Sequence, residues 1–199
     1  EQIKQHLDKI NHIETNIRQN KKSKKLLNKY HNQTEQLINQ SCNEYIDYLK
    51  KQKNSKSIMT VLELLDIKEF NKSKTTNSMH SMFVRGQLQK RLMEKLNWNG
   101  FNFMEVDPAF TSKVCPICNN LSKKNRNEKI FNCICCGYTD DADHVGGINI
   151  KSRATDAEII TICEEYEYSQ HERHKALKIL YKNRNEKFLN EQKKKVIQK

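Results

Sequence analysis

The fold of this sequence is decided by residues 115–137, which read CPICNNLSKKNRNEKIFNCICCG. The stretch holds two C-x-x-C pairs separated by fourteen residues, Cys115 with Cys118 and Cys133 with Cys136. Each pair brings two thiolates to one side of a tight turn, and two pairs together complete a tetrahedral site for Zn²⁺. Because four protein ligands leave no open position, the spacing predicts a structural zinc and not a catalytic one.

Acidic residues follow the second cysteine pair directly, where residues 140–143 read DDAD. Negative charge is favoured at a helix N-terminus, and capping accounts for one of these acids comfortably and for all three less well. Gly146 and Gly147 would let another backbone, or a substrate, approach the first helical turn closely. The alternative to capping is that an acid here binds a metal.

Another acid lies upstream, inside the apolar run SIMTVLELL at residues 57–65, which is typical of a buried strand. Burying the carboxylate of Glu63 there is costly unless it is paired or binds a metal. The alternative is that it lies at the end of the strand and points to solvent. We expect a polar loop over residues 68–78, a helix over 79–96 and a second strand over 101–106. Strand, helix and strand in this order predict an α/β core.

Both ends of the chain are predicted to be helical and basic. Apolar residues at helical spacing over residues 3–17 and 37–49 indicate a hairpin. Its elbow contains four lysines, Lys21, Lys22, Lys24 and Lys25. Residues 1–57 carry 12 basic and 6 acidic side chains, and residues 182–199, which we expect to form a frayed helical tail, carry 7 and 2. A solvated helix surface is one interpretation, and binding of a nucleic-acid backbone is the other.

The composition narrows the class of protein. With 36 basic and 24 acidic side chains among 199 residues, the net charge is +12, which favours a polyanionic partner. No run approaches the ~18 apolar residues of a membrane span, and no signal-peptide segment opens the chain. We therefore expect a helix-rich, cytoplasmic protein whose partner is a polyanion, which could be RNA, DNA or a membrane surface.

Taken together, these motifs resemble the RuvC-like nuclease region of the transposon-encoded, RNA-guided nucleases called TnpB and of the related type V CRISPR effectors. The family's strand ends in a Glu with a Leu two residues later, as Glu63 and Leu65 do here. Its Val-Asp-Pro and Thr-Ser segment before the first Cys corresponds to residues 106–115. Its last motif, Asp-x-Asn-Ala-Ala-x-Asn-Ile, corresponds to residues 143–150, which read DHVGGINI and keep the Asp as Asp143.

This resemblance implies a partial RNase H-like (RuvC) α/β core with a helical hairpin insertion and an inserted zinc ribbon of four cysteines. It implies a Mg²⁺-dependent, RNA-guided DNA endonuclease in which Glu63 and Asp143 are catalytic and bind Mg²⁺. Such a site holds two metal ions about 3.5–4 Å apart, and the carboxylates come from separate elements. Guide RNA and target DNA are the implied partners, and a membrane is not. The basic residues expected to contact the nucleic acid are Lys123, Lys124, Arg126, Lys21, Lys22, Lys24 and Lys25.

The implied domains follow each other along the chain. Residues 1–56 form the helical hairpin between RuvC motifs, and residues 57–110 the RuvC-like strand–helix–strand. Residues 111–139 form the zinc ribbon, which binds the target nucleic acid. Residues 140–154 carry the final Asp motif and its helix, and residues 155–199 form a basic helical tail.

The family's first catalytic Asp, in an Asp-x-Gly strand, has no counterpart in this sequence, and Asp8 lies in a helical stripe and does not replace it. Two ligands of three do not build the site. We therefore expect the chain alone to be inactive, as a fragment or one half of a split nuclease whose partner is the missing N-terminal portion. Two alternatives stay open: a nuclease-inactive protein that binds RNA and DNA, and a zinc-ribbon nucleic-acid-binding module. Retention of Glu63 and Asp143 argues against both.

Overall fold

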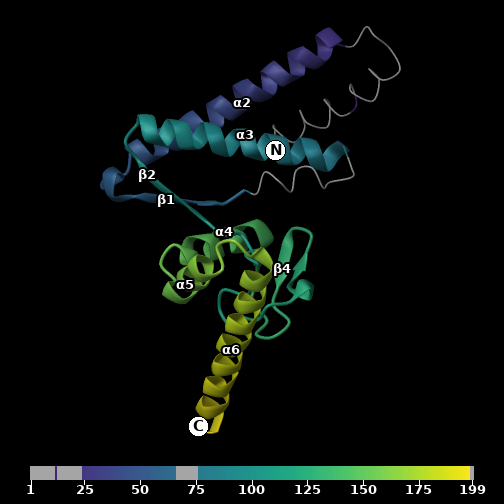
Figure 1. Cartoon of the computed structure of the whole chain (residues 1–199), viewed down its shortest axis with the longest axis vertical. Coiled ribbons are helices and arrows are strands. Elements are labelled where there is room, and N and C mark those ends of the chain that lie inside the picture. Colours follow the sequence, from purple (N-terminus) through teal and green to yellow (C-terminus); the bar gives the residue numbers. More distant parts are fainter. Residues whose placement is uncertain (1–11, 13–23, 66–75, 198–199) are drawn as a thin grey trace. The chain divides into compact units, whose positions relative to one another are not determined.

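A computed structural model of the chain describes residue 12, residues 24–65 and residues 76–197. The described chain is mixed α/β, as predicted, with helices joined by short strands (Figure 1). It divides into two compact units, and each is described by itself. The first unit comprises Glu1–Thr60 and Leu65–Met104, and the second comprises Val61–Leu64 and Glu105–Lys199.

Two helices form the core of the first unit, α2 (Lys24–Lys50) and α3 (Thr76–Trp98). Apolar residues recur every three or four positions on α2, so they share one face, and this face is buried against α3. The contacts form two clusters: Ile38 and Cys42 with Val84, and Ile46 and Leu49 with Leu96 and Phe101. Since both series ascend in number, α2 and α3 run in the same direction.

Both helices begin earlier than the apolar periodicity indicated. The helix predicted from residue 79 begins at Thr76, within the predicted loop, and α2 extends back to Lys24. Polar residues in the first turns of a helix add nothing to its apolar pattern, so the periodicity alone places the start too late. Three predicted features lie outside the described residues: the stripe over residues 3–17 apart from His12, the lysines Lys21 and Lys22, and the loop over residues 68–75.

The two predicted strands are present as β1 (Met59–Glu63) and β2 (Asn102–Val106), which pair in a two-stranded sheet. Just past β1, the Leu64 N–H donates to the carbonyl of Val106 at 2.8 Å. Gly100 makes the turn from α3 into β2 with a φ of 66°, which a glycine adopts without steric cost.

The second unit contains a three-stranded antiparallel sheet in the order β3 (Arg126–Asn127), β4 (Ile130–Asn132) and β5 (Thr139–Asp141). Phe131 at its centre pairs with Arg126 on one side and with Asp140 on the other. The Phe131 ring is fully buried in a small core with Cys115, Cys118, Cys133, Ala142 and Val145.

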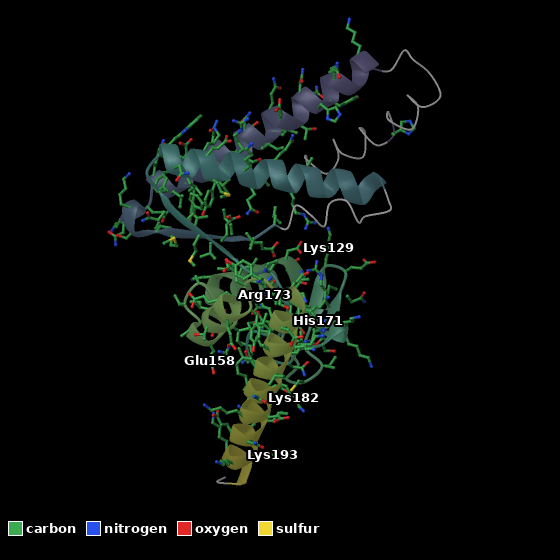
Figure 2. All side chains as sticks on the ribbon, viewed as in Figure 1. Lys129, Glu158, His171, Arg173, Lys182 and Lys193 are labelled. Atoms are coloured by element: carbon green, nitrogen blue, oxygen red, sulfur yellow. The ribbon has the colours of Figure 1, made fainter. Side chains whose placement is uncertain are left out.

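Three helices follow the sheet: α4 (Ala142–Arg153), α5 (Ala157–Glu165) and α6 (Gln170–Ile197). The predicted frayed tail is wrong for the described part, because α6 stays helical through Ile197 and extends past the sheet (Figure 1). Lys182 and Lys193 lie on its exposed surface (Figure 2). None of the helices described is both long enough and apolar enough to cross a bilayer.

Buried polar side chains fix α4 in place. The Asn149 amide donates to the carbonyls of Thr111 at 2.7 Å and Val114 at 2.9 Å, just before the first cysteine pair. At the end of α4, the buried Arg153 guanidinium donates to the carbonyls of Asp107 and Ala109. The same helix is thus held to the chain that leaves β2 and to the chain that enters the cysteine turns.

Candidate metal centre and nucleic-acid interface

Each cysteine pair lies in a tight turn that ends on a residue with positive φ. In the first turn the N–H of Asn119 donates to the carbonyl of Cys115 at 2.9 Å, and the φ of Asn119 is 60°. In the second turn the N–H of Gly137 donates to the carbonyl of Cys133 at 2.9 Å, and the φ of Gly137 is 74°. The two turns therefore share one backbone plan, with Asn119 in the place that Gly137 takes in the second.

The two turns face each other and gather the sulfurs of Cys115, Cys118, Cys133 and Cys136, called here the cysteine cluster. All four Sγ atoms lie within 4.8 Å of one another. The Sγ of Cys115 is 3.6 Å from that of Cys136, and the Sγ of Cys118 is 3.5 Å from that of Cys133.

These separations fit a metal of tetrahedral geometry. With Zn–S bonds of ~2.3 Å, the sulfurs of a tetrahedral site are about 3.8 Å apart. The cluster can therefore hold a zinc ion after a small rearrangement of its sulfurs. The remaining cysteine of this segment, Cys135, lies outside the cluster, and its N–H donates to the Sγ of Cys133 at 3.4 Å.

Burial and backbone N–H groups act in opposite directions on the thiols. Burial raises the pKa of Cys115 to about 11 and also raises that of Cys118. Burial acts the same way on Cys133, but hydrogen bonds from the N–H groups of Cys136 and Cys135, together with those from the thiols of Cys118 and Cys115, lower its pKa overall. Four thiolates packed this closely repel one another, so a divalent cation is the partner that suits the donor set.

Of the three acids after the cluster, Asp141 caps a helix. It is the N-cap of α4, and its carboxylate accepts from the N–H groups of Asp143 at 2.9 Å and His144 at 3.0 Å. Asp140 accepts from the Tyr138 hydroxyl at 2.7 Å and lies 2.9 Å from the His144 Nδ1. The Tyr138 hydrogen bond is the main reason that the pKa of Asp140 is lowered.

Asp143 has a different environment. Its side chain is 81 % exposed and forms an ion pair with the Nη2 of Arg126 at 3.0 Å. Arg126 comes from β3, two strands away from the cap of α4, and its Nε donates to the Glu128 carbonyl at 3.0 Å. The sequence analysis singled out Arg126 as a nucleic-acid contact and Asp143 as a metal ligand, but it did not predict that they touch. The register of β3, β4 and β5 brings Arg126 near the start of α4.

Glu63 is the last residue of β1 and is half-buried, between the two alternatives that the sequence left open. Among the described residues, only the cysteine cluster brings three or more potential ligands within 4.8 Å of one another. The structure therefore does not gather Glu63, Asp143 and a third ligand, and a shared metal site stays a prediction.

The predicted nucleic-acid contacts are described only in part. Lys123 and Lys124 are exposed on the 3₁₀ turn Lys123–Asn125 (η4), next to Arg126, and Lys25 is exposed near the start of α2. Of the elbow lysines, Lys21 and Lys22 lie outside the described residues, and only the backbone of Lys24 is described. Exposed lysines on one turn are compatible with phosphate contacts.

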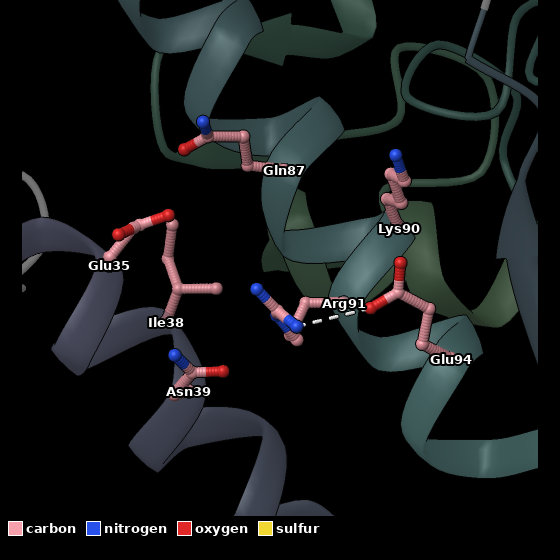
Figure 3. A pocket seen from close by; sticks show the side chains of 7 residues that line it. All are labelled: Glu35, Ile38, Asn39, Gln87, Lys90, Arg91 and Glu94. Carbon is pink, nitrogen blue, oxygen red and sulfur yellow. Dashed lines mark hydrogen bonds and ion pairs between the residues drawn. The ribbon is translucent and has the colours of Figure 1, made fainter. Parts of the chain in front are cut away.

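A separate hollow of about 190 Å³ lies between α2 and α3 in the first unit (Figure 3). Its charged lining is mixed, with Glu35 and Glu94 beside Lys90 and Arg91. Arg91 and Glu94 are paired at 3.2 Å, so the hollow presents no run of free cations to a phosphate chain.

Comparison with known proteins gives a family model that covers the cysteine cluster, and several similar proteins. The sequence model of the family "Cas12f1-like, TNB domain" matches residues 86–150. The CRISPR-associated endodeoxyribonuclease Cas12f1 of Sulfoacidibacillus thermotolerans is 36% identical over 64 residues, which cover 32% of this chain and 15% of that protein. The TnpB-like protein MJ0751 of Methanocaldococcus jannaschii is 25% identical over 138 residues, which cover 68% of this chain and 49% of that protein.

A solved structure also aligns with this chain. It is the cryo-EM structure of the Cas12f1–sgRNA–target DNA complex, aligned with a TM-score of 0.47 and 22% identity. The alignment covers 72% of this chain and 40% of that one. The chain thus spans less than half the length of the relatives that it matches.

Proposed function

We propose that this chain is the C-terminal nuclease portion of an RNA-guided DNA endonuclease. It belongs to the TnpB and type V CRISPR effector family, whose sequence model matches residues 86–150. One observation carries the proposal. A cysteine cluster able to hold a metal is followed within the matched segment by α4, whose first turn exposes Asp143. The enzyme would act on nucleic acid inside the cell, with guide RNA and target DNA as partners.

In this proposal the cysteine cluster binds one structural Zn²⁺, and residues 111–139 form a zinc ribbon. The donor set supports this, because thiolates are soft ligands that favour zinc and four of them leave no open position for catalysis. The zinc would hold the two turns together. In doing so it would fix the β3–β4–β5 sheet, on which Arg126 and the cap of α4 depend.

Glu63 and Asp143 are proposed as catalytic ligands of Mg²⁺ in a partial RNase H-like core made by β1, β2 and α4. Bound there, Mg²⁺ would activate the attacking water and stabilise the leaving oxygen of a phosphodiester. Two carboxylates from separate elements suit such a site, and the described residues gather no third ligand with them. The proposal therefore includes a further acidic ligand from outside the described residues or from a separate subunit.

Arg126 has two tasks in this proposal. It balances the charge of the Asp143 carboxylate, which lies 3.0 Å from its Nη2. When a cation takes that carboxylate, the guanidinium is free to bind a phosphate of the DNA, to which its planar donors are well matched. Lys123 and Lys124 on the neighbouring turn would extend the contact along the strand, and Lys21, Lys22, Lys24 and Lys25 would contact backbone elsewhere.

Cleavage of target DNA by the chain in its natural complex with guide RNA and any further subunit tests the proposal. We expect cleavage that requires Mg²⁺ and is lost in Asp143→Ala and in Glu63→Ala. Glu191→Gln, an exposed acid on α6, is the matched control and should cleave like the natural chain. Zinc content should stay the same in all three variants.

Cleavage that survives Asp143→Ala would overturn the catalytic assignment. Guided DNA binding without cleavage by the unaltered complex, in Mg²⁺ or Mn²⁺, would instead favour the nuclease-inactive binding protein.

A further inference from the structure

The long helix α6 reaches the metal centre through one side chain. The Nδ2 of Asn185 donates to the carbonyl of Cys118 at 2.8 Å and lies 3.5 Å from the Sγ of Cys135. Cys118 belongs to the first cysteine turn and Cys135 to the second. A residue 67 positions after Cys118 therefore contacts both turns of the cysteine cluster.

The Cys118 carbonyl is part of the peptide that joins Cys118 to Asn119. Asn119 adopts a φ of 60°, where an L side chain is less favourable than glycine, whereas the second turn has Gly137 at the matching place. The first turn is thus the one whose backbone is less stable by itself. It is also the one whose peptide receives a tertiary hydrogen bond from α6.

Asn185 is presented by a well-fixed part of α6. Four residues before it, Tyr181 is buried with Val114, Ile159 and Leu177. Three residues after it, Phe188 packs against the core that contains the buried cysteines. Beside it, Arg184 forms hydrogen bonds of 2.6 and 2.8 Å with the carboxylate of Asp156, the N-cap of α5. These contacts on both sides hold the Asn185 amide in place.

We propose that Asn185 is a positioning residue of the metal centre, one that keeps the first cysteine turn in its metal-binding geometry and so raises metal affinity. This inference rests on the proposed zinc site. Groups that orient metal ligands from outside typically account for a 10- to 100-fold difference in affinity. A sequence pattern could not have pointed to Asn185, because the contact depends on how α6 packs.

The test compares Asn185→Leu, which keeps the size of the side chain but removes its donor, with the unaltered chain. Zn²⁺ affinity is measured by competition with a chromophoric chelator at pH 7. We expect Asn185→Leu to bind Zn²⁺ about 10- to 100-fold more weakly. Asn183→Leu, on the exposed side of the same helix, is the matched control and should bind like the unaltered chain.

Two further measurements separate a positioning role from a general loss of structure. With Co²⁺ as the probe, the charge-transfer and d–d bands of the tetrahedral thiolate site should shift in Asn185→Leu only, while far-ultraviolet circular dichroism stays the same. In an Asn119→Gly background, where the first turn needs less support, the cost of Asn185→Leu should shrink.

The possible results lead to different conclusions. Equal Zn²⁺ affinity in Asn185→Leu and the unaltered chain would overturn the inference and leave the zinc site intact. An equal loss in Asn185→Leu and Asn183→Leu would also overturn it, because the effect would then belong to the helix as a whole. An unaltered chain that binds no Zn²⁺ would instead refute the proposed zinc site.

Discussion

Asp141 and Asp143 lie two residues apart and face different partners. Asp141 accepts two backbone N–H groups at the start of α4, whereas Asp143 turns toward Arg126 and solvent. Only Asp143 thus has a carboxylate that could exchange its partner for a cation without uncapping the helix. The distinction supports Asp143, and not Asp141, as the proposed Mg²⁺ ligand.

Replacing Asp141 tests this division at the scale of the residue. Asp141→Ala should lower the free energy of unfolding by about 1 kcal/mol, because α4 loses its cap, while Asp141→Asn should have little effect, since Asn caps as well. Urea denaturation of the zinc-loaded chain measures both. Equal losses in the two variants would contradict the capping role.

The members of the cysteine cluster could be predicted residue by residue, whereas the partner of Asp143 could not. A C-x-x-C turn is local, so its spacing alone brings two sulfurs together, and the structure joins two such turns. The contact between Arg126 and Asp143 depends instead on the register of a hairpin with very short strands. Strands of two or three residues carry too little apolar alternation for that register to be predicted from the sequence.

At the scale of the element, α6 contacts several separate parts of the second unit. Its side chains reach α5 through Arg184, the first cysteine turn through Asn185 and the buried cysteine core through Phe188. Two of these three contacts are polar, and a periodicity of apolar residues does not register them. The strands β1 and β2 and the helices α2 and α3 were easier to predict because apolar residues define them, although the packing of α2 against α3 was not predicted.

Replacing Arg184 tests whether its ion pair with Asp156 joins α6 to α5. The hydrogen bond from Arg184 is the main reason that the pKa of Asp156 is lowered. The pair therefore stabilises the fold above the usual carboxyl pKa of about 3.9, and the contribution is lost as the pH falls through the lower folded-state value. Arg184→Leu should lower the free energy of unfolding by about 1–3 kcal/mol, by the same amount at pH 6 and at pH 8.

The control for Arg184→Leu is Lys182→Leu on the same helix. Lys182 is exposed and lies 3.9 Å from Glu186, so its ion pair contributes little. Urea denaturation at the two pH values compares the variants. A loss in Arg184→Leu no larger than in Lys182→Leu would contradict the role of Arg184 in joining α5 to α6.

At the scale of the whole molecule, the described chain is two compact units with different kinds of core. The first is held by apolar contacts between α2 and α3, and the second by the cysteine core and by Val114, Ile159, Leu177 and Tyr181. Strands of two or three residues are too short to be stable alone, so the β3–β4–β5 sheet depends on its cysteine turns.

Chelation should therefore affect the two units unequally. Removal of about one zinc per chain by EDTA should speed amide hydrogen exchange across residues 111–141 and leave the α2 amides between Ile38 and Leu49 unchanged. Cys115→Ser should lower the zinc content, whereas Cys163→Ser, a half-buried cysteine outside the cluster, should keep it. Unchanged exchange after metal removal would contradict a structural zinc.

The grouping of the four cysteines could be predicted from the sequence, whereas the distance between the two proposed magnesium ligands could not. Glu63 and Asp143 are separated by α3, β2 and the cysteine turns, so their distance depends on the packing of several elements at once. A family motif can mark both residues, but it does not measure the gap between their carboxylates.

The proposed roles of Glu63 and Asp143 as metal ligands are tested most directly by anomalous diffraction. The crystals would contain the guide RNA–target DNA complex and be grown with Mn²⁺ in place of Mg²⁺. If both residues bind the catalytic metal, a manganese peak should lie about 2.0–2.3 Å from the carboxylate oxygens of Glu63 and of Asp143. A cleaving complex whose manganese is bound by neither residue would contradict these roles.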